Sequence, residues 1–302
     1  MEIKDYSACR LSGRYYGGAE KKLGVLIDGL PFMLKFQKRT LFGFRHNVIS
    51  EYLGSHIYQL LGLPCQETFL GTYRGEPVVA CKDFTAGGFQ FVPFNDVGES
   101  TIETNKELYQ YSYDDIVTLL LRNKKLTEVE GTVSSFFDVY IVDALLGNFD
   151  RHGGNWGFLK REGRYILAPV FDNGSCLFPN LTDEDEMRRI VNDQEEIDLL
   201  VYRFPTSQIK LNGQKSSYHQ VIDSLAFPLV NEALGRICPR VDAPAIEELI
   251  DGLEVISPIH KLFYKTVVRN RYEKILKAPY EKLRGGRSDE DPFLEGLDLR
   301  PR

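Results

Sequence analysis

A carboxylate and an amide stand at a spacing that suits phosphoryl transfer. The segment LGNFDRHGGNWGF, residues 146–158, places Asp150 and Asn155 five positions apart on a glycine-containing loop. A carboxylate there can orient an attacking hydroxyl and accept its proton, while the amide oxygen can bind a metal ion. The same D-x-x-x-x-N spacing occurs in the catalytic loop of protein kinases. The loop is therefore a candidate catalytic site, with Asp150 as the base.

A second carboxylate follows in the segment APVFDNG, residues 168–174. Asp172 stands after an apolar stretch that we expect to be a strand, and a glycine turn follows, which suits a magnesium ligand that bridges phosphates. Residues 156–168 predict a hairpin around Arg161-Glu162-Gly163, which would bring Asp172 beside Asn155. Each segment alone is more often an ordinary turn. Together, in this order, they favour metal-dependent phosphoryl transfer.

The N-terminal part carries basic residues that could bind phosphate. Lys35 stands among apolar residues in MLKF, and a lone charge on a buried strand is costly unless it is paired. Glu51, in the next predicted helix, is the expected partner. The alternative is that Lys35 faces water from an edge strand and that Glu51 is a solvated helix residue.

A glycine loop precedes the first of these strands in the stretch YYGGAEKK. Adjacent glycines let backbone N–H groups approach phosphate closely, and a lysine could add charge. The candidate nucleotide loop comprises Gly17, Gly18, Ala19, Glu20, Lys21 and Lys22. The pattern of a P-loop, G-x-x-x-x-G-K-[ST], is not present in the sequence.

The composition is that of an ordinary globular protein. The 302 residues, 43% of them hydrophobic and 26% charged, can bury one large core or two lobes. A net charge of -6 argues against wholesale binding to nucleic acid. The sequence contains neither an apolar stretch of the roughly 18 residues that a membrane helix needs nor an apolar signal-peptide core, so we expect a cytoplasmic protein. The five cysteines are scattered without metal-ligand spacing and indicate reduced thiols.

Two strand pairs are predicted near the N-terminus. Residues 23–36 are two apolar runs joined at Asp28-Gly29, which is a hairpin turn signal. Residues 67–73 and 77–81 predict a second hairpin around Arg74-Gly75. Between the two pairs, residues 47–61 follow helical spacing, with Asn47 as the N-cap. We therefore expect a small antiparallel sheet that carries one helix.

The character of the sequence changes after Phe84. Residues 85–88 are expected to form a connector, and the segment from there to about residue 110 is expected to be irregular. Helices are predicted over residues 135–146, 217–234, 243–253 and 258–277. The prediction is an α+β, bilobal, protein-kinase-like fold: a β-rich N-lobe over residues 1–84, a mainly helical C-lobe over residues 85–284, and a flexible tail over residues 285–302.

These segments resemble the HipA family of bacterial serine/threonine kinases, whose catalytic domain is itself similar to phosphatidylinositol kinases. The resemblance rests on LLGNFDRHGGNWGF and LAPVFDNGS, together with YYGGAEKK, FMLKF and SEYLGSHIYQLLGLP nearer the N-terminus. It extends from about residue 11 to about residue 275.

The resemblance implies a role for each matching residue. Asp150 is implied to be the catalytic base, Asn155 and Asp172 to hold magnesium, and Lys35 to bind the ATP phosphates that residues 17–22 would cover. Further phosphate contacts are implied for His152, Gly153, Gly154 and Asn155. The hinge residues just before the connector, Lys82, Asp83 and Phe84, would receive the adenine through backbone hydrogen bonds.

The sequence departs from the family pattern in two places. HipA toxins carry an extra N-terminal subdomain, whereas here the glycine loop begins close to Met1. The chain is therefore similar to the short HipA-like kinases, which include a translocated Helicobacter type, and an antitoxin partner is left open. The family often has a phosphorylatable serine in its glycine loop. Tyr15 stands at the aligned place, with Ser12 just upstream, and these two are the candidate autophosphorylation sites.

We predict an ATP- and magnesium-dependent kinase that phosphorylates serine or threonine hydroxyls of a protein substrate. One alternative is a lipid or small-molecule kinase, because D-R-H-x-x-N also occurs in phosphatidylinositol kinases; the absence of an evident basic membrane-binding segment in the sequence disfavours it. The other is a non-catalytic nucleotide-binding module, which is disfavoured because the polar groups that catalysis needs are present.

Overall fold

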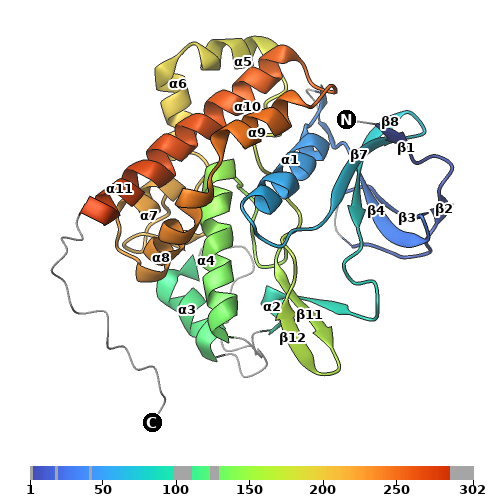
Figure 1. Cartoon of the computed structure of the whole chain (residues 1–302), viewed down its shortest axis with the longest axis horizontal. Helices are drawn as coiled ribbons and strands as arrows, with labels where there is room; N and C mark the ends of the chain where they lie inside the picture. The colour runs from blue at the N-terminus through green and yellow to red at the C-terminus, as the bar shows by residue number, and fades with distance from the viewer. Residues whose placement is uncertain (1–2, 18–19, 41–42, 98–110, 123–128, 286–302) are drawn as a thin grey trace.

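A β-rich part and a helical part lie side by side in this protein (Figure 1). The computed structural model describes residues 3–17, 20–40, 43–97, 111–122 and 129–285. The β-rich part comes from the N-terminal third of the chain, and most of the helices come from the rest. This is the two-lobed α+β arrangement that the sequence predicts. The predicted boundary after residue 84 stays a proposal, and the predicted tail after Gly285 lies outside the described residues.

The main sheet contains both predicted hairpins. Its strands are β1 (Lys4–Asp5), β2 (Arg10–Leu11), β3 (Lys22–Ile27), β4 (Leu30–Phe36), β7 (Thr68–Tyr73) and β8 (Glu76–Lys82), in the order β1-β7-β8-β4-β3-β2. Both turns carry left-handed residues, with φ of 50° and 79° at Asp28 and Gly29 and of 52° and 78° at Arg74 and Gly75. These angles suit two-residue hairpins. The expectation of an all-antiparallel sheet is wrong at one edge, because β1 pairs with β7 in parallel.

The alternation of side chains along β4 decides which residues face the helix. Phe32, Leu34 and Phe36 point into a small core on one side of the sheet. Successive side chains of a strand point to opposite faces, so Met33 and Lys35 point to the other side. Met33 accordingly packs against the large core that fills the helical part.

Helix α1 (Asn47–Leu60) covers this second face of the sheet. The prediction that Asn47 is its N-cap is wrong: His46 precedes the helix and makes no capping bond. The Asn47 side chain instead accepts a hydrogen bond from the Lys38 N–H and donates one to the Phe36 carbonyl, both at 3.0 Å. These two hydrogen bonds tie the start of α1 to the end of β4. They satisfy the polar atoms of the Asn47 side chain, which is buried. Two short strands, β5 (Arg39–Thr40) and β6 (Gly43–Phe44), lie between β4 and α1.

A second, three-stranded sheet directly adjoins the candidate loop of residues 146–158. The predicted hairpin around Glu162 is confirmed as β11 (Gly157–Arg161) and β12 (Arg164–Leu167). The expectation of irregular structure before residue 110 is wrong for β9 (Gln90–Pro93), which pairs with β11, and for the short helix α2 (Phe94–Val97). A strand of this kind forms because it pairs with a strand far away in the sequence, so the local residue pattern does not predict it. Residues 98–110 lie outside the described residues.

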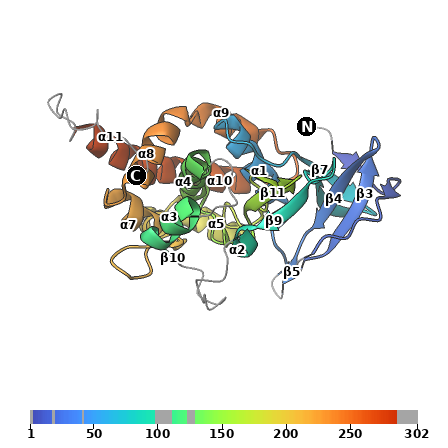
Figure 2. The same cartoon turned by 90° about the horizontal axis from the view of Figure 1, so that it is seen from below.

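The helical part surrounds α4 (Val129–Leu146), which runs through its middle in both views (Figure 1, Figure 2). The predicted helix 217–234 is two helices, because Leu225 has a left-handed φ of 51° and Phe227 is extended before Pro228. No described helix is both long and apolar enough to cross a membrane. The other elements are α3 (Tyr113–Arg122), α5 (Glu184–Val191), α6 (Gln194–Asp198), α7 (Tyr218–Asp223), α8 (Pro228–Ile237), α9 (Ala243–Asp251), α10 (Pro258–Arg271) and α11 (Ala278–Gly285). Two π-helical turns, Leu199–Arg203 and Tyr272–Lys277, a short 3-10 turn, Cys238–Arg240, and the parallel pair β10 (Tyr111–Ser112) and β13 (Ile209–Lys210) complete it.

Candidate active site

Lys35 joins three segments that are far apart in the sequence. Its Nζ lies 2.8 Å from Glu51 Oε2 and 2.8 Å from Asp172 Oδ1. Burial alone would lower the pKa of Lys35, but the two carboxylates outweigh it and hold the pKa well above its ordinary value. The predicted pairing with Glu51 is therefore present, and the alternative of a lysine that faces water is wrong. A buried ammonium between two carboxylates is well placed to receive phosphate oxygens at the same point.

Asp172 is held in an unusual backbone conformation. Its φ is 59°, in the left-handed region, and its side chain is 36% exposed. Burial would raise the pKa of Asp172, but the Lys35 ammonium overrides it and lowers the pKa to about 2. The expectation that Asp172 ends a strand is wrong, because Val170 makes only an isolated bridge with Cys65. Asp172 is nevertheless an ionised and accessible carboxylate.

Two glycines allow α1 to approach this carboxylate segment. A Cβ on Gly54 would lie 2.7 Å from Asn173 Cβ, closer than real Cβ contacts occur. A Cβ on Gly174 would lie 3.3 Å from Glu51 Oε2. The absence of side chains at both positions lets the helix that carries Glu51 pack directly on the turn that carries Asp172.

Arg151 connects the loop of Asp150 to the segment of Asp172. Its Nε and Nη2 donate to the two carboxylate oxygens of Asp143 at 3.0 and 3.1 Å. Its Nη1 donates to the carbonyls of Asn155 and Phe171, at 3.1 and 2.5 Å, and Nη2 also donates to Asn173 Oδ1 at 2.6 Å. All five N–H groups of the guanidinium therefore have an acceptor. This one side chain positions both predicted metal-binding segments.

Sequence reasoning missed the roles of Asp143, Arg151 and Asn173. The signal for Asp143 was present: it is one of two aspartates in residues 135–146, a stretch that is apolar nearly all round, and a buried charge needs a partner. Asp143 Oδ1 also accepts hydrogen bonds from Tyr58 and Asn148, both at 2.7 Å. Its partners could not be identified from the sequence, since they come from α1 and from the loop.

Asp150 lies at the accessible edge of the loop. Its side chain is 54% exposed, and burial of the remainder raises its pKa above the ordinary value, while the nearby His152 opposes this rise in pKa. His152 Nε2 lies 4.0 Å from Asp150 Oδ1, and His152 Nδ1 accepts the Gly154 N–H at 3.0 Å. The histidine therefore braces the glycine turn of the loop and faces the carboxylate at the same time.

Asn155 and Asp172 have the donor chemistry of a magnesium site. Asn155 Nδ2 donates to the Asp150 carbonyl at 2.8 Å, so its Oδ1 is the atom left to bind a metal ion. Among the described residues there is no group of three His, Cys, Asp or Glu side chains that could hold a metal. Magnesium is usually bound by one or two protein oxygens, with phosphates and water completing its coordination. The residues present fit such an ion.

The lysines of the glycine loop point to different sides. Lys22 stands opposite Lys35 in the β3–β4 register, and its Nζ donates to the Gly17 carbonyl at 2.7 Å. Lys21 instead pairs with Glu76 at 2.9 Å and lies over the Phe36 ring, on the face of the sheet opposite to Lys35. The phosphate contact predicted for this loop is therefore kept for Lys22 and not for Lys21. Gly18 and Ala19 lie outside the described residues, and Glu20 makes no hydrogen bond or ion pair with the described part of the chain.

The hinge residue Asp83 is tied to the segment that precedes the glycine loop. The Asp83 carboxylate accepts hydrogen bonds from Arg14 at 2.5 Å, from Tyr16 at 2.8 Å and from the Thr85 N–H at 2.8 Å. The N–H groups of Lys82 and Asp83 are used within the sheet, where they donate to the carbonyls of residues 67 and 31. These two N–H groups are therefore not available to adenine, and the backbone contact predicted for residues 82–84 stays a proposal.

The two candidate phosphorylation sites differ in access. Tyr15 is 93% exposed. Ser12 packs against β3, so that a Cβ on Gly24 would lie 2.4 Å from Ser12 Oγ, and Ser12 Oγ accepts the Arg14 N–H at 3.3 Å. Of the two hydroxyls, the one on Tyr15 is better placed to reach another protein group.

The six-stranded sheet, the helix α1 that covers one of its faces and the Lys35–Glu51–Asp172 cluster define a protein of the kinase-like class. The family model of the HipA-like C-terminal domain matches residues 15–240. The chain belongs to this family.

Individual relatives agree in sequence and in structure. The chain is 33% identical, over 93% of its length and 89% of the relative's, to a protein of Helicobacter pylori strain J99 named serine/threonine-protein kinase CtkA. The crystal structure of the H. pylori proinflammatory kinase CtkA matches 93% of this chain and 99% of its own, at 33% identity and a TM-score of 0.86. The HipA of Shewanella oneidensis, solved with HipB and operator DNA, matches 91% of this chain and 68% of its own, at 18% identity and a TM-score of 0.58. The last match shows a shared fold.

Proposed function

We propose that this protein is a HipA-like serine/threonine-protein kinase that transfers the γ-phosphoryl group of ATP to a hydroxyl of a protein substrate. The observation that carries the proposal is the position of Lys35, whose Nζ lies 2.8 Å from carboxylate oxygens of both Glu51 and Asp172. The identity to CtkA over 93% of the chain supports the same chemistry. The proposed units are a lobe of residues 1–84, a lobe of residues 85–284 and a tail from residue 285.

The proposed roles follow from the chemistry of each group. Asp150 accepts the proton of the attacking hydroxyl, and its raised pKa makes it a stronger base than an ordinary aspartate. Lys35 and Lys22 hold phosphate oxygens of ATP. Asn155 and Asp172 would hold magnesium, which when bound supplies positive charge that stabilises the transferring phosphoryl group.

The adenine is proposed to lie against an aromatic cluster beside the connector. The rings of Phe84 and Phe91 lie 5.4 and 5.1 Å from that of Phe171, which directly precedes Asp172. A base that packs against this cluster would direct its phosphates toward Asp172 and Lys35. The Phe84 backbone would add a hydrogen bond, and the His152–Asn155 turn would contact phosphate.

The test is phosphate incorporation measured by mass spectrometry after incubation with ATP and magnesium. The wild type is expected to phosphorylate a protein hydroxyl, either its own or that of a generic protein substrate, and Asp150→Asn should reduce the rate by about 10²–10⁴-fold without loss of thermal stability. Asp114→Asn, on the exposed surface of α3, is the matched control and should keep full activity.

Three results would contradict the proposal. Equal incorporation by Asp150→Asn would remove its assigned base. Transfer to lipid or small-molecule acceptors, with protein acceptors inert, would favour the lipid-kinase alternative. A rise in melting temperature with ATP and magnesium, but no transfer to any acceptor, would indicate a nucleotide-binding module. If the protein modifies itself, Tyr15→Phe and Ser12→Ala decide which hydroxyl is used.

A further inference from the structure

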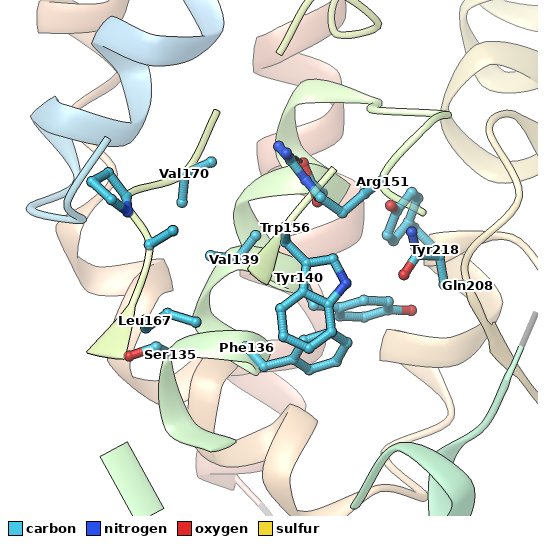
Figure 3. Close-up of a pocket in the computed structure, with 13 residues that line it drawn as sticks. Ser135, Phe136, Val139, Tyr140, Arg151, Trp156, Leu167, Val170, Gln208 and Tyr218 are labelled. Carbon is cyan, nitrogen blue, oxygen red and sulfur yellow. Dashed lines mark hydrogen bonds and ion pairs between the residues drawn. The ribbon is translucent and has the colours of Figure 1, made fainter. Parts of the chain in front are cut away.

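A cavity lies behind the catalytic loop, between α4 and the segment that follows β12 (Figure 3). Its enclosed part is small, about 30 Å³, and the empty space reaches about 500 Å³ only when the open solvent at its mouth is included. One wall is a face of α4 that includes Phe136, Val139 and Tyr140, and the opposite wall is the chain from Leu167 to Val170. Trp156 lies between the two walls, over the ring of Phe136.

This cavity is separate from the proposed nucleotide site. The residues that line it include none of the groups to which ATP or magnesium chemistry is assigned, namely Lys35, Glu51, Asp150, Asn155 and Asp172. It nevertheless touches the chain on both sides of that chemistry, because Trp156 directly follows Asn155 and Val170 stands two residues before Asp172. The cavity and the active site therefore share walls without sharing ligand groups.

The lining specifies the charge of a ligand. The charged residues that line the cavity are Asp143 and Arg151, and these two are paired with each other at 3.0 Å. Every N–H of Arg151 already has an acceptor, so the pair offers no free charge to an ionic ligand. An ion that left water for this site would lose its hydration without gaining a partner. The cavity therefore excludes charged molecules.

The lining also specifies shape and polarity. Phe136, Tyr140 and Trp156 present aromatic surfaces toward the space, which favours an aromatic ligand. Two polar side chains at its border, Ser135 and Gln208, make no hydrogen bond with the described residues and can bond to one or two groups of a ligand. A peptide backbone would bring more hydrogen-bonding groups than these two side chains can match.

We propose that this cavity binds a neutral, mainly aromatic small molecule, at a site separate from that of ATP. Because its walls include Trp156 and Val170, the occupant also biases the segments that carry Asn155 and Asp172. This coupling rests on the proposed kinase function, whereas the binding itself does not.

Trp156 makes the test direct, since it is the single tryptophan of the chain. The probe is N-phenyl-1-naphthylamine, a neutral aromatic fluorophore that accepts excitation energy from tryptophan. Titration of the full chain should give saturable, one-to-one binding with quenching of Trp156 emission. Ser135→Phe and Val139→Phe each place a ring in the cavity and should weaken binding by about tenfold or more, a change of about 1.4 kcal/mol.

The matched control is Ile166→Phe, which adds the same ring on the exposed side of β12, next to Leu167. It should bind the probe as the wild type does. Two filling positions are used so that a variant that fails to fold does not decide the result, and melting temperatures identify such a variant. Non-saturable binding, or equal binding by both folded filling variants, overturns the site. So does displacement of the probe by charged analogues at the same affinity as by neutral ones.

The coupling has its own measurement. Binding free energies are reciprocal, so ATP and magnesium must change the affinity for the probe by the factor by which the probe changes theirs. If the affinity for the probe is the same with and without ATP and magnesium, the coupling is overturned, whereas the proposed binding site still stands. Loss of kinase activity in Asp150→Asn with unchanged probe binding keeps the two proposals distinguishable.

Discussion

At the scale of single residues, two aspartates of the site have pKa values that move in opposite directions. The Lys35 ammonium, acting against the effect of burial, lowers the pKa of Asp172 to about 2. Burial raises the pKa of Asp150, and the nearby His152 opposes this rise. When the environment moves the pKa values of two carboxylates apart in this way, the two groups suit different roles. The one with the lower pKa suits an ionised ligand, and the one with the higher pKa suits a base.

The first prediction concerns the pH dependence of Asp150. A base must be ionised, so kcat/KM should fall as the pH falls through its pKa, which lies above the ordinary value of about 3.9. His152 opposes this rise in the pKa of Asp150, so His152→Gln should move the acid limb to higher pH. A pH profile of kcat/KM for both proteins measures the change, with His219→Gln as a control away from the loop. An unmoved limb in His152→Gln would contradict the assignment.

At the scale of elements, α1 is positioned by the close approach of Gly54 to Asn173. Gly54→Ala should lower the free energy of unfolding by about 1–3 kcal/mol because the added methyl overpacks this contact. It should also weaken ATP binding, since Glu51 moves with the helix. Alanine is intrinsically the better helix former by about 1 kcal/mol, so a loss has to come from the clash.

Gly235→Ala in α8 is the matched control, because its new Cβ would meet nothing within 4 Å. There the same substitution should raise stability by about 0.5–1 kcal/mol. Urea unfolding of the two variants measures the sign of each change in the free energy of unfolding. A stabilising Gly54→Ala would show that α1 is not held against the Asp172 segment.

The loop itself depends on the buried pair of Asp143 and Arg151. Asp143→Asn leaves the Arg151 charge without its counterion and should lower the free energy of unfolding by about 3–5 kcal/mol. Asp138→Asn, on the same helix, breaks the more exposed pair with Arg236 and should lower it by only about 1 kcal/mol. Equal losses in denaturant unfolding would contradict the central role of the Arg151 network.

At the scale of the whole molecule, the Lys35–Asp172 pair joins the β-rich part to the segment after β12. In the unfolded chain Asp172 titrates near about 3.9, whereas the folded protein holds its pKa at about 2. The stabilisation that the Lys35–Asp172 pair contributes to the folded state is therefore complete above about pH 4, and it is lost as the pH falls toward about 2. Stability should decline more steeply over this range in the wild type than in Lys35→Met.

Chemical denaturation at a series of pH values measures this difference. Lys82→Met is the control, because it removes an exposed lysine paired with Glu67 and should keep the slope of the wild type. Identical slopes for the wild type and Lys35→Met would mean that the pair does not hold the two parts together.

The sequence by itself determined the features that depend on neighbouring residues. Asp28-Gly29 and Arg74-Gly75 form the predicted turns because left-handed φ angles are local properties of such pairs. The hairpin β11–β12, which lies between the loop and Asp172, could be predicted because its turn is also a local property of neighbouring residues. The pairing of Lys35 with Glu51 was predictable because a buried lone charge requires a partner nearby.

Only the tertiary structure decided which residues far apart in the sequence come into contact. The Arg151 network joins α4, the loop and the Asp172 segment, and β9 is a strand only because β11 lies beside it. Asn47 looked like a helix cap but bonds to the end of β4 instead. The cavity lined by Trp156 has no sequence signature at all. The physical reason is that local spacing determines dihedral angles and periodicity, whereas such contacts depend on how whole elements pack.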